Sequence, residues 1–378
     1  MIDISIDTKT LLAAVKASIP HLTTEVHLPA MSRLCLKAKD GHLSIIAWKG
    51  LSGRRQDLEC EVHGEGSIVF GGKSFASLLS NLRGDTVRLT ADETTFWVTI
   101  KCGRSKTKQA AYPVTDYPDV PDLPGDAEML EVDPSELGEA LRHVLFSASS
   151  DDARVNIFAV HIAKRDDAVD VVTTDGHRMA AYTVSDGAWP LPTSTISAPG
   201  AKNLLQELDG ERSVRLGVGV DGRYLIAQVG NSTWTAARIV EVTFPPYVQV
   251  IPKRKKGTLT VPREDLLGAL RVVLPTAEQK APSCSLIRDG DTIVVHVDSE
   301  RGLASSEVDV EIDGEAPAVI GVNIRYLADA LEHASDDKVQ IDVETYLDPM
   351  VVREGAYRAV VMPMRTSAAD AQGKASRA

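Results

Sequence analysis

The sequence repeats itself three times, and this repetition limits the folds that the chain can adopt. Three segments each run through a helical pattern, with leucines three and four apart, and then alternate apolar and polar residues as a strand does. The strands open at Val87, Val214 and Val339, at intervals of 127 and 125 residues. Each repeat also begins with a short strand before another helix, in IDTKTLLAAV, VDPSELGEAL and VPREDLLGAL. The chain is therefore expected to hold three similar domains.

Each predicted domain holds two helices and two groups of short strands. The hairpin signals between the strands favour antiparallel sheets, and so an α+β class rather than a doubly wound fold. The helices are predicted over residues 8–18, 72–83, 134–146, 200–210, 262–274 and 323–334. The predicted domains are residues 1–125, 126–252 and 253–365, followed by a small, polar tail over 366–378 that we expect to be disordered.

Composition is that of a globular protein rather than a disordered or membrane-spanning one. Hydrophobic residues make up 43% and charged residues 25% of the 378 residues, and no apolar run has the length of a membrane span. The N-terminus lacks the pattern of a signal peptide. The four cysteines form no CxxC pair, and the histidines form no pair at i, i+4. We expect a cytoplasmic protein without a metal or cofactor.

The net charge of −12 argues against a protein that grips nucleic acid through a general positive field, because such domains usually have a high pI.

The stretch GVGVDG, Gly217 to Gly222, matches the glycine pattern of dinucleotide-binding loops. That motif needs a helix after it, whereas here the alternating segment RYLIAQV follows. A hairpin turn is the favoured interpretation.

The stretch TTDGHRMAAY collects residue types that also build hydrolase sites. Asp175 and Gly176 stand between two apolar runs, which predicts a type I′ hairpin turn with His177 and Arg178 beginning the returning strand. A hydrolase that uses Asp175 and His177 is the alternative, although no G-x-S-x-G elbow or similar nucleophile motif accompanies them.

Four features together resemble one family, the bacterial sliding clamp or beta subunit of DNA polymerase III. They are the three-fold repeat, TDGHRMA in the middle repeat, FPPYVQVIP at its end and AVVMPMR near the C-terminus. The resemblance implies a processivity-clamp fold and a homodimer whose two subunits join head to tail in a ring around duplex DNA. Such a protein catalyses nothing and tethers the replicative polymerase. A monomeric relative that binds partners without closing a ring is the second alternative.

The resemblance also implies a cleft that receives short linear peptides from polymerase, clamp loader and repair proteins. Methionine, valine and proline would give it an adaptable apolar wall, and histidine and arginine would supply hydrogen-bond donors. Gln249 stands where many relatives carry arginine. The residues that match the wall are Arg154, Ile157, Thr174, Gly176, His177, Arg178, Met179, Pro245, Val250, Asn323, Tyr326, Val360, Val361, Met362, Pro363, Met364 and Arg365.

In this family helices line the central hole, so DNA-facing residues are sought on the predicted helices. These carry nine basic and eight acidic residues, a slight positive balance against the net −12 of the chain. A closed ring needs only a mildly favourable inner surface. The candidates are Lys9, Lys16, Lys73, Arg83, Lys202, Arg263 and Arg271.

Overall fold

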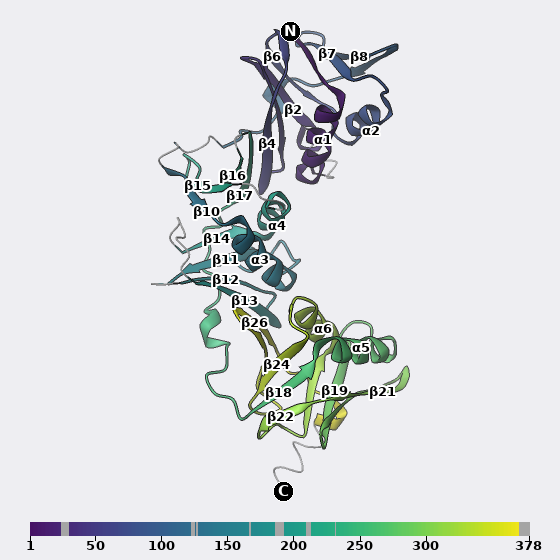
Figure 1. Ribbon diagram of the computed structural model, residues 1–378, viewed down its shortest axis with the longest axis vertical. Coiled ribbons are helices and arrows are strands. Elements are labelled where there is room, and N and C mark those ends of the chain that lie inside the picture. The colour runs from purple at the N-terminus through teal and green to yellow at the C-terminus, as the bar shows by residue number, and fades with distance from the viewer. Residues whose placement is uncertain are drawn as a thin grey trace. The chain divides into compact units, whose positions relative to one another are not determined.

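We analysed a computed structural model of the full chain (Figure 1). It describes residues 1–23, 30–121, 125, 128–165, 168–185, 193–208, 213–230 and 232–369. Residues 370–378, most of the expected tail, lie outside the described residues.

All six expected helices are present, and each begins and ends within three residues of its predicted bounds. The three equivalent leucines of the repeat, Leu11, Leu137 and Leu266, are all buried. The first helix is capped by Asp7, whose carboxylate accepts the Thr10 N–H at 2.7 Å. The helices are α1 (Thr8–Ser18), α2 (Lys73–Asn81), α3 (Pro134–Val144), α4 (Ala198–Glu207), α5 (Arg263–Val273) and α6 (Ile324–Glu332).

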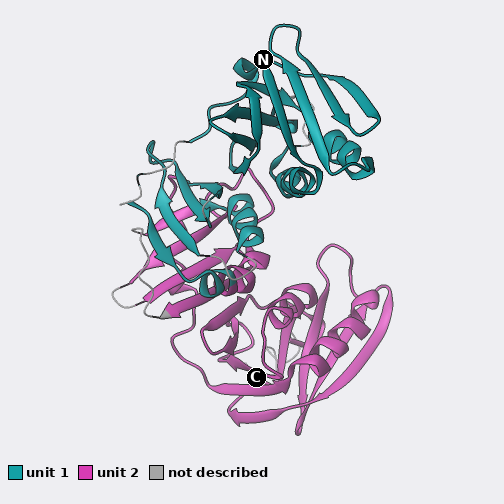
Figure 2. Ribbon diagram, turned by 45° about the horizontal axis from the view of Figure 1, so that its top comes forward, with its two compact units in different colours: residues 1–138, 188–191, 196–240 teal, residues 139–187, 192–195, 241–378 magenta. Residues whose placement is uncertain are grey.

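The chain divides into two compact units (Figure 2). Unit 1 comprises residues 1–138, 188–191 and 196–240, and unit 2 comprises residues 139–187, 192–195 and 241–378. The division falls inside the middle repeat, because each unit contains a large sheet that combines strands from two consecutive repeats. The three-domain division remains a prediction drawn from the repeat.

Unit 1 contains a five-stranded and an eight-stranded sheet. In the larger sheet β17 (Thr233–Arg238) pairs with β4 (Ser52–Glu59), so Thr235 of the second repeat lies opposite Arg54 of the first. The smaller sheet has the order β5 (Glu61–Gly64), β1 (Ile2–Asp7), β7 (Thr86–Asp92), β8 (Trp97–Cys102), β9 (Ser105–Ala110). The larger has the order β10 (Leu130–Val132), β15 (Val214–Val218), β16 (Tyr224–Val229), β17 (Thr233–Arg238), β4 (Ser52–Glu59), β3 (His42–Trp48), β2 (Leu34–Lys39), β6 (Gly66–Phe70).

Strand β3 shows how the larger sheet of unit 1 serves two cores. Leu43 and Ile45 point into the core that also contains residues of α1 and α2. Ile46 and Trp48 belong to a second core, where the Trp48 ring meets Tyr224 edge-on at 5.0 Å. Successive side chains of a strand point to opposite faces, so a strand buried on both faces reads as a continuous apolar run.

Unit 2 contains a nine-stranded and a four-stranded sheet, and every described strand pair is antiparallel. This confirms the α+β expectation. The larger sheet has the order β14 (Ser194–Ser197), β11 (Ala159–Lys164), β12 (Ala168–Thr174), β13 (Arg178–Ser185), β26 (Tyr357–Val361), β25 (Met350–Glu354), β24 (Lys338–Val343), β18 (Gly257–Pro262), β22 (Glu311–Gly314). The smaller has the order β21 (Gly302–Asp309), β20 (Thr292–Ser299), β19 (Ser283–Asp289), β23 (Val319–Asn323).

The glycine-rich stretch from Gly217 to Gly222 is a hairpin turn, as predicted. It joins the antiparallel pair β15 and β16, and the Gly222 N–H donates to the Gly219 carbonyl at 2.8 Å. A strand follows where a dinucleotide-binding loop would need a helix.

The beginning of the expected tail is folded. Thr366 accepts a hydrogen bond from the Ser285 hydroxyl at 2.8 Å, and Ala369 is only 2% exposed at the end of a short helical turn. Residues 366–369 therefore correct the expectation of a tail that is disordered from residue 366, since Thr366 is hydrogen-bonded to the fold and Ala369 is buried.

Candidate functional site

The stretch TTDGHRM forms a hairpin turn between β12 and β13 in the large sheet of unit 2, as predicted. Thr174 pairs with Met179, and the Asp175 N–H donates to the Arg178 carbonyl at 3.3 Å. The predicted turn type is wrong, because a type I′ turn needs positive φ at both central residues and only Gly176 has it, at 92°. The Asp175 carboxylate accepts the N–H groups of His177 at 2.9 Å and Arg178 at 3.0 Å. The two central residues of the turn are therefore Gly176 and His177, one position later than predicted.

Arg154 lies against this turn and explains its glycine. Its Nη1 donates to the Asp175 carbonyl at 3.0 Å. A Cβ atom on Gly176 would lie 3.0 Å from Arg154 Nη2, and the positive φ would strain any other residue. Glycine thus lets the guanidinium approach the turn.

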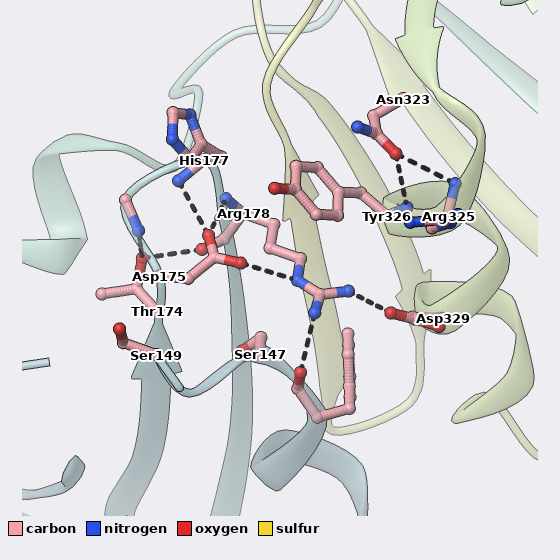
Figure 3. A network of polar contacts seen from close by, with 12 residues as sticks. Ser147, Ser149, Thr174, Asp175, His177, Arg178, Asn323, Arg325, Tyr326 and Asp329 are labelled. Atoms are coloured by element: carbon pink, nitrogen blue, oxygen red, sulfur yellow. Dashed lines mark hydrogen bonds and ion pairs between the residues drawn. The ribbon is translucent and has the colours of Figure 1, made fainter. Parts of the chain in front are cut away.

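The Arg178 side chain joins the middle repeat to the third repeat (Figure 3). Its Nε donates to Asp175 Oδ2 at 3.0 Å, its Nη2 to the Phe146 carbonyl at 2.9 Å, and its Nη1 to the Asp329 carboxylate on α6. The guanidinium also lies over the Tyr326 ring, 4.6 Å from its centre. Only 13% of the Arg178 side chain is exposed, so its position is fixed.

Tyr326 presents an aromatic face beside the turn. The Asn323 side chain caps α6 by accepting the N–H groups of Arg325 at 3.0 Å and Tyr326 at 3.3 Å, which fixes the start of the helix. The His177 ring is stacked on the Tyr326 ring at 6.3 Å and 17°. An exposed imidazole and a phenol ring thus lie together.

The C-terminal strand runs directly beside the turn. Strand β26 pairs with β13, and the Met362 N–H then donates to the His177 carbonyl at 3.1 Å. The next residues leave β26 and contact β23, where the Met364 N–H donates to the Gly321 carbonyl at 2.8 Å. A Cβ atom on Gly321 would lie 2.1 Å from the Met364 carbonyl oxygen, so glycine permits this approach.

The structure divides the expected wall residues into an exposed set and a buried set. The buried ones support the surface from within the core: Ile157, Met179, Val360 and Val361, each at most 2% exposed. Met362 is 37% and Val250 40% exposed, and Pro245, Pro363 and Met364 are half-buried. Arg365 is exposed, and Thr174 and Asn323 serve the turn and the helix cap. We call the turn surface the exposed side chains of His177, Val250 and Met362 together with the partly buried side chains of Arg178 and Tyr326.

Two contributors to this surface were missed from the sequence. Asp329 lies one helical turn after Tyr326 on α6, so its proximity to Arg178 could have been found from the i, i+3 spacing. The Phe146 carbonyl could not have been found, because every residue type has a backbone carbonyl and the sequence does not show which one accepts a hydrogen bond.

This geometry is suited to holding a polypeptide rather than to catalysis. The Asp175 carboxylate is occupied by two N–H groups and a guanidinium, which leaves it no role as a base. Within the described residues, no serine, threonine or cysteine side chain is hydrogen-bonded to His177. The same part of the chain groups no three His, Cys, Asp or Glu side chains as a metal site would. Donors beside exposed apolar side chains remain.

Comparison with known proteins identifies the family of this chain. Residues 2–121 match the family described as the N-terminal domain of the DNA polymerase III beta subunit, and residues 248–365 match its C-terminal domain. The chain belongs to the DNA polymerase III beta-subunit family of sliding clamps. The "Beta sliding clamp" of Synechococcus elongatus is 26% identical over 353 residues, which cover 91% of this chain and 92% of that protein.

Solved structures of beta subunits share the fold. The beta subunit of Thermotoga maritima superposes with a TM-score of 0.86 at 23% identity, covering 97% of this chain and all of that one. The clamp of Bartonella birtlesii, solved bound to griselimycin, gives 0.87 at 20% identity, with the same coverage. The clamp fold is thus confirmed, and so is the sliding-clamp function of the family. This family is non-catalytic, which removes the hydrolase alternative for Asp175 and His177.

The expected DNA-facing residues differ between the two units of the clamp. Lys9, Lys16, Lys73 and Lys202 are exposed on α1, α2 and α4, and Arg83 is exposed just beyond α2. On α5 of unit 2, Arg263 contacts Glu264 at 3.0 Å and Arg271 contacts Glu332 at 2.9 Å. The pairing partly neutralises both arginines, so the positive helical charge lies mainly in unit 1. Among the described helices, none combines the length and the apolar character needed to cross a membrane.

Proposed function

We propose that two copies of this clamp join head to tail around duplex DNA, and that replication proteins are tethered through short peptides that dock on the turn surface. The observation that supports the ring is a pair of exposed sheet edges with side chains of opposite charge, one in each unit. Heterologous contacts of this kind close a ring when the rotation between copies allows it.

The edge in unit 1 is β9, the last strand of the five-stranded sheet. Its exposed residues include Lys106 and Lys108, and the Lys108 amine lies 5.0 Å from the centre of the Trp97 ring. Trp97 itself is 42% exposed on the neighbouring strand. This edge offers unpaired backbone groups, positive charge and an exposed indole.

The edge in unit 2 is β21, the last strand of the four-stranded sheet. It exposes Glu307 and Asp309, while Leu303 on the same strand is 73% and Val272 on α5 is 61% exposed. A strand edge with exposed apolar residues normally needs protection or a partner. Pairing β9 of one copy with β21 of the other would satisfy the backbone groups and oppose charges of unlike sign.

A charge exchange tests this interface. Light scattering should give a mass near twice 40.7 kDa for the wild type. Replacing Lys106 and Lys108 together by Glu should yield monomers, and adding Glu307→Lys and Asp309→Lys to the same chain should restore the dimer. A wild type that stays monomeric at micromolar concentration, or a charge exchange that restores nothing, would contradict the proposed ring.

Encirclement of DNA by a closed ring also predicts how the protein should bind DNA. Once loaded, the ring should stay on circular DNA and slide off a linear end, while the free protein binds duplex weakly and loses binding steeply with salt. Equal retention on circular and linear DNA would argue for ordinary surface binding. We expect the docking peptides to belong to the polymerase and the clamp loader. We expect the protein to act in the cytoplasm.

A further inference from the structure

Four consecutive basic residues, Lys253 to Lys256, follow the turn surface along the chain. They connect the short helix η6 (Tyr247–Gln249) to β18, and all four are exposed. We call this segment the basic connector. The clamp as a whole carries a net charge of −12, so a run of four cations forms a local region of opposite sign.

One member of the connector fixes its position. Lys255 Nζ lies 3.2 Å from Asp342 Oδ1 and donates to Thr258 Oγ1 at 3.0 Å. Asp342 lies on β24 with 7% of its side chain exposed, and it also holds the guanidinium of Arg353. The buried carboxylate thus anchors the connector against the sheet and is neutralised by two cations.

The other three members have no such partner. In the part of the chain that the structure describes, Lys253, Arg254 and Lys256 form no ion pair. Three members of the connector, Lys253, Arg254 and Lys255, line a pocket of about 360 Å³ together with Pro252, Arg353 and two carboxylates, Asp342 and Glu344. The lining holds four cations, those three residues and Arg353, against the two carboxylates, so the pocket keeps an excess of positive charge.

The pocket lies close to the turn surface. Val351 lines the pocket and also packs in the apolar cluster that contains Met179 and Val360, directly behind that surface. Val250, an exposed member of the turn surface, precedes Lys253 by three residues, a separation of at most about 10 Å along an extended chain. A single bound peptide could therefore reach both places.

We propose that the basic connector selects partner peptides whose apolar anchors are flanked by aspartate or glutamate. Apolar side chains of the peptide contact Met362 and Val250, and carboxylates about three to six residues further along, at roughly 3.3 Å per extended residue, lie over Lys253, Arg254 and Lys256. This inference rests on the proposed docking role of the turn surface. Opposite charge at the rim of an interface mainly raises specificity and the association rate.

Duplex phosphate is the other polyanion that this segment could meet. It is disfavoured because the connector borders an apolar surface suited to side chains, whereas the exposed lysines of the expected DNA face lie on helices. DNA binding by the connector is therefore a measurable outcome that would contradict the proposal.

The experiment uses the intact dimer and labelled peptides. The probe is the C-terminal decapeptide of the host replicative polymerase, extended at one end or the other by Glu-Asp-Glu or by Gln-Asn-Gln. One variant carries Lys253→Ser, Arg254→Ser and Lys256→Ser and keeps Lys255 because that residue is structural. The control carries Lys37→Ser, Lys39→Ser and Lys101→Ser, which remove three exposed charges from strands β2 and β8 of unit 1.

Exposed ion pairs are individually weak, so the acidic extension at one end should raise the affinity of the wild type and the control by about threefold to tenfold in 50 mM salt. The gain should shrink towards 1 M salt, where the Debye length is about 3 Å. The connector variant should lose the gain and bind the neutral peptide as the wild type does.

The possible failures are distinguishable. If the neutral peptide binds equally to all three proteins but the acidic one gains nothing, the connector proposal is overturned while the docking surface stands. If the neutral peptide does not bind at all, the docking role itself fails. If the connector variant instead loses affinity for a labelled duplex while the acidic gain persists, the segment contacts DNA.

Discussion

Each unit contains an arginine–carboxylate ion pair that connects two consecutive repeats, and we call each of these two contacts a joint. The two joints differ in their solvent exposure. In unit 1, Arg54 of the first repeat donates its Nε to Glu207 of the second at 2.6 Å, and the two side chains are 4% and 10% exposed. In unit 2, Arg178 of the second repeat contacts Asp329 of the third, with 13% and 37% exposed. The ion pair in unit 1 is buried, and we call it the sealed joint. The ion pair in unit 2 is partly exposed, and we call it the open joint.

Further polar contacts surround the ion pair of the sealed joint. Arg54 Nη2 donates to Gln56 at 3.0 Å, and the His21 ring nitrogen Nε2 lies 3.7 Å from the Glu207 carboxylate. Burial alone would raise the pKa of Glu207, but the neighbouring His21 and Arg54 lower it overall. In the open joint the corresponding space presents His177 and Tyr326 to solvent. One joint maintains the fold, and the other combines that role with the proposed docking surface.

The largest expected effect comes from opening the sealed joint. Arg54→Ala leaves the Glu207 carboxylate buried without its main partner, which should lower the free energy of unfolding by about 3–5 kcal/mol. Urea denaturation followed by far-UV circular dichroism, which reports on both units, measures the loss.

Arg55→Ala is the matched control for that measurement. Arg55 lies next in the chain and contacts Asp57 at 2.8 Å, but its side chain is 37% exposed, so we expect a change below about 1 kcal/mol. Arg178→Ala should cost less than Arg54→Ala, because water reaches Asp329. Equal losses at Arg54 and Arg178 would show that burial does not separate the two joints.

The next effect concerns docking on the open joint. Burying a methionine side chain contributes about 1.5–3 kcal/mol, and 1.4 kcal/mol is a tenfold change in affinity. Met362→Ala should therefore raise the dissociation constant of a labelled polymerase C-terminal peptide by roughly tenfold or more, with folding and dimerisation intact. Fluorescence anisotropy measures this change.

Val220→Ala serves as the docking control. Val220 is 73% exposed in the turn between β15 and β16, a hairpin of unit 1 that carries no docking residues. It should leave peptide affinity unchanged. Wild-type affinity in Met362→Ala would mean that the peptide does not dock on the turn surface.

A smaller effect should appear when the pH falls. Burial lowers the pKa of His21 below its ordinary value of 6.5, so the unfolded chain binds this proton more readily than the folded one. The stability of unit 1 should then decrease as the pH falls below about 6.5, by at most about 1.4 kcal/mol per pH unit for one group. The measurement is the urea midpoint of unit 1 between pH 7.5 and 5.

The variant His21→Phe isolates this contribution. Its stability should depend less on pH than that of the wild type over the same range. His161 in unit 2, whose pKa is also lowered by burial, is present in both proteins and cancels. A pH dependence identical in wild type and variant would show that His21 does not titrate differently on folding.

The comparison also separates what the sequence could predict from what it could not. Helices and hairpins followed from local patterns, so the six helices were placed within three residues and the turn at Asp175 was recognised. The joints depend on side chains about 150 residues apart, such as Arg54 with Glu207, and no local pattern reports such a pair. The repeat could not show that each large sheet would combine strands of two repeats.

Within the turn surface, residue types indicated the chemistry but not the exposure. Met179 and Met362 both looked like apolar wall residues, yet Met179 is 2% exposed and Met362 is 37% exposed. Met179 lies on β13, where the cluster around Val360 covers it, whereas Met362 comes directly after the end of the neighbouring strand β26. Packing between distant segments decides which methionine a peptide can reach.

The smallest expected effect concerns the C-terminus. Removing residues 370–378 should leave stability and peptide affinity unchanged. Removing residues 367–378 also deletes Ala369, which is 2% exposed and donates its N–H to Thr366 Oγ1 at 3.3 Å. Since a buried CH₂ or CH₃ group contributes about 0.8 kcal/mol, the longer deletion should lower stability by roughly 1 kcal/mol and still spare peptide affinity.

Thr366→Ala in the full chain is the control for this pair of deletions, because it removes the hydrogen bond to Ser285 and keeps Ala369 in place. Denaturation of the three proteins and anisotropy with the polymerase peptide would rank them. Lost peptide binding on removal of residues 370–378 alone would mean that the last nine residues contribute to the turn surface. The C-terminus would then form part of the surface at the open joint, and the comparison of the two joints would have to include it.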